Sequence, residues 1–182
     1  MSFFRVRAVA LFVVIGLCFG LDAQDAKKPR YVFLMIGDGM GVNQRESAAE
    51  YLNATTGKSL VMESFPAKCL TTTTSLSGLT DSAAAGTALA CGVKTKNGML
   101  GVTPDGKSIY SVAVDAKKKG MKVAIMTDVP LNHATPAAFY AHCNARNSYS
   151  DITNFLPESD FDIFVGDKFL VSKGESLPDA FL

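Results

Sequence analysis

The sequence predicts an α/β protein built on a mostly parallel sheet that is flanked by helices on both faces. Short apolar segments of strand length alternate along the chain with longer segments of helical character, the order that produces a parallel sheet. The first apolar segment, residues 31–36, has no polar alternation, as expected for a strand that is buried on both faces. With 182 residues, of which 48% are hydrophobic, the chain has the size of one such domain.

Residues 1–23 have the pattern of a secretory signal peptide. Two arginines precede an apolar stretch from Ala8 to Leu21, whose core is too short for a stable membrane span. We therefore expect a secreted or periplasmic protein, and an uncleaved membrane anchor is the alternative that the sequence favours less. Residues 24–30 are expected to link this leader to a domain over residues 31–182.

The first predicted strand, residues 31–36, runs directly into a Gly-Asp-Gly sequence centred on Asp38. Because ligands bind beyond the carboxyl ends of the strands in open α/β sheets, this order places Asp38 at the functional edge, where a carboxylate suits a hard or borderline cation. A simple tight turn is the alternative. A helix over residues 43–53, opened by a capping box, and a β-rich segment over residues 69–74 are predicted to follow.

The segment Thr80-Asp81-Ser82 leads directly into a run of small residues that predicts a helix. Ser82 then lies at the helix N-terminus, where unpaired backbone N–H groups and the positive end of the helix dipole hold anions. A serine at that position is a candidate nucleophile for phosphate or carbonyl chemistry. An ordinary N-cap formed by Asp81 or Ser82 is the structural alternative.

The later segments continue the alternation of helices and strands. They predict a turn over residues 96–98, an amphipathic helix over residues 108–119, a strand over residues 122–127 and a last strand over residues 161–165.

The strand over residues 122–127 is expected to end at the same sheet edge as the first strand. Beyond it, Thr135 followed by Pro136 predicts an N-cap with proline at the first helical position. The helix that begins there is expected to continue to His142 and to lead towards Arg146.

Charge and cysteine content narrow the class of protein. The formal net charge of +1, without a basic patch interleaved with aromatic residues, gives no indication of nucleic-acid binding. Of the four cysteines, Cys18 lies in the predicted leader, and Cys69, Cys91 and Cys143 follow no zinc-finger spacing. Export permits disulfides, but three cysteines cannot all pair within one chain. We expect Cys91 to be a buried thiol.

Three segments together resemble the alkaline phosphatase family. They are the strand that ends in Gly-Asp-Gly at Asp38, the run of small residues after Ser82, and His133-Ala134-Thr135-Pro136 with Arg146 thirteen positions after its histidine. The resemblance implies an alkaline-phosphatase-like fold that is incomplete, with residues 31–182 as the N-terminal part of the catalytic domain.

The resemblance implies a catalytic role for three residues. Ser82 resembles the nucleophile that becomes phosphoserine, Arg146 the arginine that grips the phosphate, and Asp81 the carboxylate that orients this arginine. A planar guanidinium matches two phosphate oxygens, so positioning and charge stabilisation carry most of the catalysis. The implied reaction is the hydrolysis of phosphate monoesters.

The resemblance also implies zinc and magnesium as cofactors. Asp38 resembles the carboxylate shared between a zinc and the magnesium, Thr135 resembles the hydroxyl ligand in the magnesium region, and Ser82 is expected to coordinate zinc, which lowers its proton affinity. His133 is the remaining metal candidate; the best-known bacterial members carry aspartate there, and other branches carry histidine. The complete enzyme is a candidate homodimer with no membrane span after leader cleavage.

The number of histidines bears on how much of the family's metal site the chain contains and on which other functions are considered. The chain has only two histidines, His133 and His142, whereas the family holds its zincs mainly with histidines and aspartates in the second half of the catalytic domain. We therefore expect only the N-terminal half of the site here. One alternative is a non-catalytic phosphate- or metal-binding fragment. A weaker one is a sulfatase or phosphodiesterase, and the Asp-Ser-Ala-Ala-Ala run at Ser82 disfavours a sulfatase.

Overall fold

The computed structural model describes residues 29–174 and 176–177. The predicted leader over residues 1–23 and most of the predicted linker over residues 24–30 lie outside them. The chain divides into two units, Met1–Gly37 and Asp38–Leu182. In the part of the chain that the structure describes, no helix is both long and apolar enough to cross a membrane. The described elements, all in the second unit, are α2 (Val42–Thr56), η1 (Val61–Ser64), α3 (Ser82–Cys91), α4 (Val112–Lys118), β1 (Ala124–Met126), α5 (Ala134–Ala137), α6 (Tyr149–Glu158) and β2 (Ile163–Val165).

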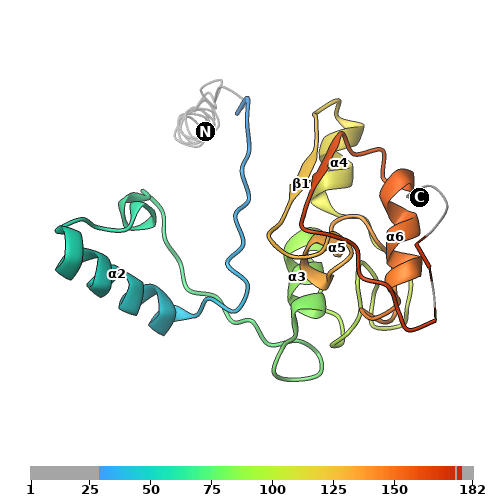
Figure 1. Ribbon diagram of the computed structural model, residues 1–182, viewed down its shortest axis with the longest axis horizontal. Helices are drawn as coiled ribbons and strands as arrows, with labels where there is room; N and C mark the ends of the chain where they lie inside the picture. Colours follow the sequence, from blue (N-terminus) through green and yellow to red (C-terminus); the bar gives the residue numbers. More distant parts are fainter. Residues whose placement is uncertain (1–28, 175, 178–182) are drawn as a thin grey trace, which may run out of the picture. The chain divides into compact units, whose positions relative to one another are not determined.

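The sheet consists of two parallel strands joined through helices. β1 and β2 pair with Ala124 opposite Ile163 and Met126 opposite Val165. The connection between them contains α5 and α6, because parallel neighbours require a crossover (Figure 1). The predicted α/β class with an open parallel sheet and flanking helices is therefore confirmed in partial form. Both strands are shorter than the predicted segments 122–127 and 161–165.

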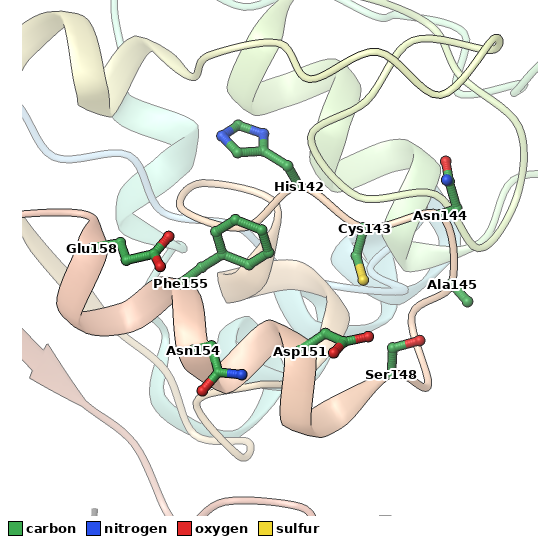
Figure 2. Close-up of a pocket in the computed structure, with 9 residues that line it drawn as sticks. All are labelled: His142, Cys143, Asn144, Ala145, Ser148, Asp151, Asn154, Phe155 and Glu158. Carbon is green, nitrogen blue, oxygen red and sulfur yellow. The ribbon is translucent and has the colours of Figure 1, made fainter. Parts of the chain in front are cut away.

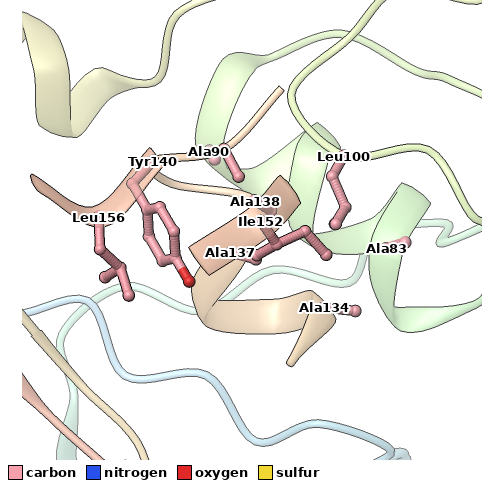
Figure 3. Close-up of a cluster of buried hydrophobic side chains, with 10 residues drawn as sticks. Ala83, Ala90, Leu100, Ala134, Ala137, Ala138, Tyr140, Ile152 and Leu156 are labelled. Carbon is pink, nitrogen blue, oxygen red and sulfur yellow. The ribbon is translucent and has the colours of Figure 1, made fainter. Parts of the chain in front are cut away.

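The core of the second unit is assembled largely from small side chains around α3 and α5. A Cβ added to Gly86 on α3 would lie 3.0 Å from the Cβ of Ala138, so the backbones of these segments approach closely. Leu100 and Ile152 are fully buried beside them. Figure 3 shows this cluster, which consists of Ala83, Ala90, Leu100, Ala134, Ala137, Ala138, Tyr140, Ala141, Ile152 and Leu156.

Two predicted β segments do not form strands, and those predictions are wrong. Residues 31–36, which the structure describes, are exposed and have no strand assignment, and residues 69–74 are likewise exposed and irregular. A strand that is apolar on both faces is stable only when it pairs with neighbours and helices cover it. Neither segment has such a pairing among the described residues.

The beginnings of two helices also differ from prediction. The helix α2 begins at Val42 after Gly41, and no side chain caps it, so the predicted capping box at Asn43 is wrong. The helix predicted over residues 108–119 is α4, which begins only after Ser111; the Ser111 hydroxyl accepts from the Val114 N–H at 3.3 Å. The residues before Ser111 do not join this helix because they pair with the preceding loop, where the Ile109 N–H donates to the Gly101 carbonyl at 2.9 Å.

A charged cluster joins α4 to the beginning of both strands. The Asp162 carboxylate accepts from Lys122 at 2.8 Å, from Lys117 at 2.9 Å and from the Val123 N–H at 2.9 Å. The hydrogen bond from Lys122, followed by those from Lys117 and the Val123 amide, holds the pKa of Asp162 well below its usual value. The cluster therefore stabilises this end of the sheet while Asp162 is ionised.

Candidate functional site

Asp81 and Ser82 divide two tasks at the start of α3. The Asp81 carboxylate caps the helix, since its Oδ1 accepts from the Ala84 N–H at 3.0 Å. Ser82 is the first helical residue, and its hydroxyl donates to Oδ1 of Asp38 at 3.2 Å. The N-cap alternative is thus correct for Asp81, and the serine side chain is directed to a different partner.

Asp38 brings together residues that are distant in sequence. It lies in a turn with Gly39, whose φ of 72° is in the left-handed region that glycine adopts without strain. Its second oxygen, Oδ2, accepts from the Thr135 hydroxyl at 2.6 Å. The hydrogen bonds from Thr135 and, less strongly, Ser82 lower the pKa of Asp38. The site therefore contains an ionised carboxylate between two hydroxyl groups at neutral pH.

Thr135 reaches Asp38 because α5 begins earlier than predicted. The N-cap of α5 is His133, so Thr135 is the second helical residue and Pro136 the third. The prediction of Thr135 as the N-cap is wrong: its hydroxyl bonds to Asp38 instead of capping the helix.

The predicted continuation of this helix to His142 is also wrong, because α5 ends at Ala137. The chain beyond it turns to pair with another segment. The Cys143 N–H donates to the Leu100 carbonyl at 2.8 Å, and the Leu100 N–H donates to the Cys143 carbonyl at 2.8 Å. Arg146 therefore lies on a turn after this bridge.

Arg146 is held at both ends of its guanidinium. Its Nη1 forms an ion pair with Oδ2 of Asp81 at 3.2 Å, and its Nη2 lies 3.3 Å from Nε2 of His133. An arginine can only donate, so Nε2 accepts and the imidazole proton lies on Nδ1. Burial and the Arg146 charge lower the pKa of His133, which favours the neutral ring. His133 therefore contacts the arginine through Nε2, while its Nδ1 is buried and has no hydrogen-bond partner among the described residues.

Two residues that sequence reasoning did not assign to the site support Asp81. The Gly98 N–H donates to Oδ2 of Asp81 at 3.0 Å, and the Asp81 N–H donates to Oδ1 of Asn97 at 3.3 Å. The side-chain amide of Asn97 also donates to the Leu79 carbonyl at 2.8 Å. The sequence marked residues 96–98 as a turn, which was the available signal, but their contact with Asp81 depends on the tertiary fold.

The donor atoms at Asp38 fit one kind of cation better than another. The carboxylate of Asp38 and the hydroxyls of Ser82 and Thr135 supply oxygen atoms, which are the ligands that magnesium prefers. Zinc is usually held by histidine, cysteine and carboxylate groups. Among the residues that the structure describes, no group of three or more such side chains could hold a metal ion. The oxygen atoms around Asp38 therefore fit part of a magnesium shell, and the described residues form no zinc cage.

A separate pocket of about 470 Å³ lies along α6 and the loop before it (Figure 2). His142 is on its wall, and Nδ1 of this ring lies 2.8 Å from the Gly101 carbonyl oxygen. Asp151 and Glu158 also line it. None of the six predicted site residues is among its lining residues, so the pocket is distinct from the site at Asp38.

The fold and site define an open α/β protein in which a serine at a helix N-terminus lies beside a carboxylate and an ion-paired arginine, and the helix N-terminus and the guanidinium are both groups that bind anions. The predicted resemblance is confirmed at this point. The chain belongs to the alkaline phosphatase family, whose sequence model matches residues 29–165.

Individual relatives agree with this assignment. The chain is 38% identical over 146 residues to alkaline phosphatase 4 of Bacillus subtilis (strain 168). This match covers 72% of the present chain and 30% of the Bacillus protein. It is 35% identical over 147 residues to the alkaline phosphatase of Gadus morhua, with 72% and 31% covered. The chain therefore spans less than a third of the length of these curated relatives.

Solved structures show the same fold. The alkaline phosphatase of Thermus thermophilus matches with a TM-score of 0.64 and 33% identity, over 69% of this chain and 28% of that one. A variant of the TAB5 alkaline phosphatase, in which a histidine is replaced by aspartate and Mg is bound in the M3 site, matches with a TM-score of 0.58 and 32% identity. That match covers 64% of this chain and 35% of the other.

Proposed function

We propose that the chain provides the nucleophile half of a phosphomonoesterase site, and that Ser82 forms a phosphoserine during hydrolysis of phosphate monoesters. The observation that carries this proposal is the position of Ser82 at the N-terminus of α3, with its hydroxyl 3.2 Å from Asp38. Membership of the alkaline phosphatase family supports the same reaction.

The proposed reaction is a double displacement at phosphorus. Oγ of Ser82 forms a bond to phosphorus while the bond to the ester oxygen breaks, and that oxygen leaves with the electron pair and gains a proton. Water then attacks the phosphoserine, which releases inorganic phosphate and restores the hydroxyl. No redox step is involved, and the serine proton passes to solvent.

Asp38 orients the nucleophile in this scheme and does not act as a strong base. The lowered pKa of Asp38 makes its carboxylate a poor proton acceptor, although it still accepts the hydrogen bond that fixes the Ser82 hydroxyl. A cation bound at these oxygens would lower the pKa of the serine hydroxyl. We propose that Asp38 and Thr135 contribute ligands to magnesium, and that Asp38 and Ser82 contribute ligands to zinc.

Arg146 is proposed to bind the phosphoryl oxygens. Asp81 and His133 occupy one donor on each terminal nitrogen, and the remaining guanidinium hydrogens are available to a ligand. The side chains of Arg146 and Asp81 are only about a quarter exposed, at 27% and 25%, so the pair is partly shielded from solvent. The guanidinium is thereby preorganised for the transition-state charge. In this proposal His133 acts through Arg146 instead of ligating the metal.

A second candidate is a phosphate- or metal-binding fragment without turnover. The absence of a group of three metal-binding side chains in the described part of the chain favours it. In that case Ser82, Arg146 and the α3 N-terminus would still bind an anion, but the serine hydroxyl would not be activated.

We further propose export and assembly for the complete enzyme. The pattern of residues 1–23 supports a secreted or periplasmic location. A homodimer is proposed from the family resemblance, and sedimentation of the complete enzyme would test it.

The deciding experiment is hydrolysis of p-nitrophenyl phosphate by the full chain at alkaline pH, with zinc and magnesium or with chelator. Ser82→Ala is the test variant, and Ser64→Ala, at the exposed end of η1, is the matched control. We expect chelator-sensitive turnover that Ser82→Ala abolishes and Ser64→Ala leaves unchanged. Turnover unaffected by Ser82→Ala would remove the serine from its role. Phosphate binding without turnover would identify the second candidate.

A further inference from the structure

We propose that Asn132 is a positioning residue that holds His133 and Thr135 in place against Arg146 and Asp38. This inference rests on the proposed function, because it assigns Asn132 a part in binding phosphate. Asn132 directly precedes His133, the N-cap of α5, and only two residues separate it from Thr135. Any shift of Asn132 therefore moves both side chains that contact the rest of the site.

The side chain of Asn132 is fully buried and fully bonded. Its amide nitrogen lies 2.8 Å from the Leu170 carbonyl, 2.9 Å from the Thr153 hydroxyl and 3.4 Å from the Tyr149 carbonyl. Its Oδ1 accepts from the Leu170 N–H at 2.8 Å. Asn132 thus binds both backbone groups of Leu170 and also contacts α6, so it links three segments of the chain at one point.

This link extends the pairing of the two strands into the loops beyond them. After β1 and β2, the Thr127 N–H donates to the Val165 carbonyl at 2.9 Å, and the Leu131 N–H donates to the Lys168 carbonyl at 2.9 Å. Asn132 makes the next contact, to Leu170. The loop that leads from β1 to His133 and α5 is consequently attached along its length to the loop that follows β2.

Close packing leaves this attachment little freedom to shift. A Cβ added to Gly166 would lie 2.8 Å from Cγ of Leu131, so the two loops are already in tight contact. The side chain of Tyr140 supports the same place, since its hydroxyl donates to the Leu131 carbonyl at 2.7 Å. Residues 131 and 132 are therefore a fixed point from which α5 begins.

Only an amide satisfies this environment. The Leu170 carbonyl and the Thr153 hydroxyl oxygen both accept from the amide, whereas the Leu170 N–H needs an acceptor. The Thr153 hydroxyl already donates its own proton to the Tyr149 carbonyl at 2.7 Å, so it takes the acceptor role towards Asn132. An aspartate of the same shape would accept from Leu170 but would face two carbonyl oxygens with a buried charge. Asn132→Asp is therefore expected to displace residues 131 and 132, and Asn132→Ser to loosen their attachment without adding a charge.

The test uses the full chain and a readout that does not require turnover. Imidazole nitrogen shifts in NMR spectra report which ring nitrogen of His133 carries the proton, and the chain has only one other histidine, His142, as an internal reference. Leu156→Ala is the control, since Leu156 is buried on α6 and is not a partner of Asn132. Binding of inorganic phosphate is measured by calorimetry on the same proteins.

In both Asn132 variants we expect the His133 proton to be shared between the two ring nitrogens instead of staying on one, while the His142 signals stay unchanged. Phosphate binding should weaken by about tenfold or more. Leu156→Ala should lower the melting temperature but change neither readout. Unchanged His133 signals in both variants would overturn the proposal, as would loss of the folded state in both with Leu156→Ala still folded. Absence of phosphate binding by the unmodified chain would count against the proposed function, whereas the His133 signals would still decide the role of Asn132.

Discussion

Replacing Asp81 with asparagine tests whether one carboxylate both caps α3 and holds Arg146. In the structure, one oxygen of Asp81 accepts from Ala84 and the other accepts from Gly98 and from Arg146. Asparagine has the same shape but only one acceptor oxygen. If that oxygen stays on the α3 cap, the NH₂ group faces two donors, and if it turns to Arg146, the cap is lost.

The magnitude follows from the bonds that Asp81→Asn cannot replace. A hydrogen bond to a charged group contributes about 1.5–3 kcal/mol and a neutral one about 1 kcal/mol. Arg146 and Asp81 are about a quarter exposed, at 27% and 25%, so solvent screening reduces the first value. We therefore expect a loss of about 2 kcal/mol in the free energy of unfolding, or a melting temperature lower by about 4–8 °C for a chain of this size.

Urea unfolding and phosphate binding together measure both effects of Asp81→Asn. Phosphate affinity should fall by about tenfold, because Arg146 loses the contact that fixes one of its terminal nitrogens. Asp105→Asn is the matched control. Asp105 accepts from the Thr103 hydroxyl and pairs with Lys107 but lies on the surface, so its replacement should change neither quantity. The reasoning would be refuted by an Asp81→Asn variant that binds phosphate as well as the unmodified chain and has a free energy of unfolding within about 0.5 kcal/mol of it.

Further predictions concern packing, acid stability and thiol reactivity. Gly86→Val should destabilise the chain by about 1–3 kcal/mol, because even the first carbon of the new side chain meets Ala138 at 3.0 Å; thermal melting equal to that of the unmodified chain would contradict this. The pKa of Asp162 is lower in the folded chain than in the unfolded one, so its stabilising effect is complete above about pH 5 and decreases as pH falls below about 4. The stability advantage over Asp162→Asn in urea should therefore be smaller at pH 3 than at pH 7, and an equal advantage would refute the linkage. Burial raises the pKa of the Cys91 thiol to about 11, so at pH 8 a thiol reagent should label exposed Cys69 rapidly and Cys91 slowly; equal labelling rates in peptide mapping would count against this burial.

The two-stranded sheet leaves several of its apolar side chains uncovered. Met126 is 71% exposed, Ile163 54% and Val165 45%, although all three are strand residues with apolar side chains. An open parallel sheet with such an edge is prone to association. The two-stranded sheet therefore leaves apolar strand side chains exposed to solvent.

The sequence by itself determined the family, the α/β class and most helix positions. Local signals were sufficient where the interacting groups are near each other along the chain, as for Asp81, which caps its own helix at Ala84. The polar Thr-Asp-Ser segment followed by a run of small residues predicted a helix that begins at Ser82, and α3 begins at that serine. Likewise, the strands at 124–126 and 163–165 lie within the apolar segments that predicted them.

Tertiary structure alone decided which side chains meet at the site. Thr135 carried a valid local signal for an N-cap, but its hydroxyl bonds to Asp38, which lies 97 positions away. Residues 31–36 carried a valid signal for a buried strand, which fails because strand formation depends on a partner that the segment does not have among the described residues. Asn132 showed no signal beyond its place next to His133, and its three-way link appears only when α6 and the loop after β2 come together. Local propensity acts over a few residues, whereas hydrogen bonds between distant segments depend on the packing of the whole unit.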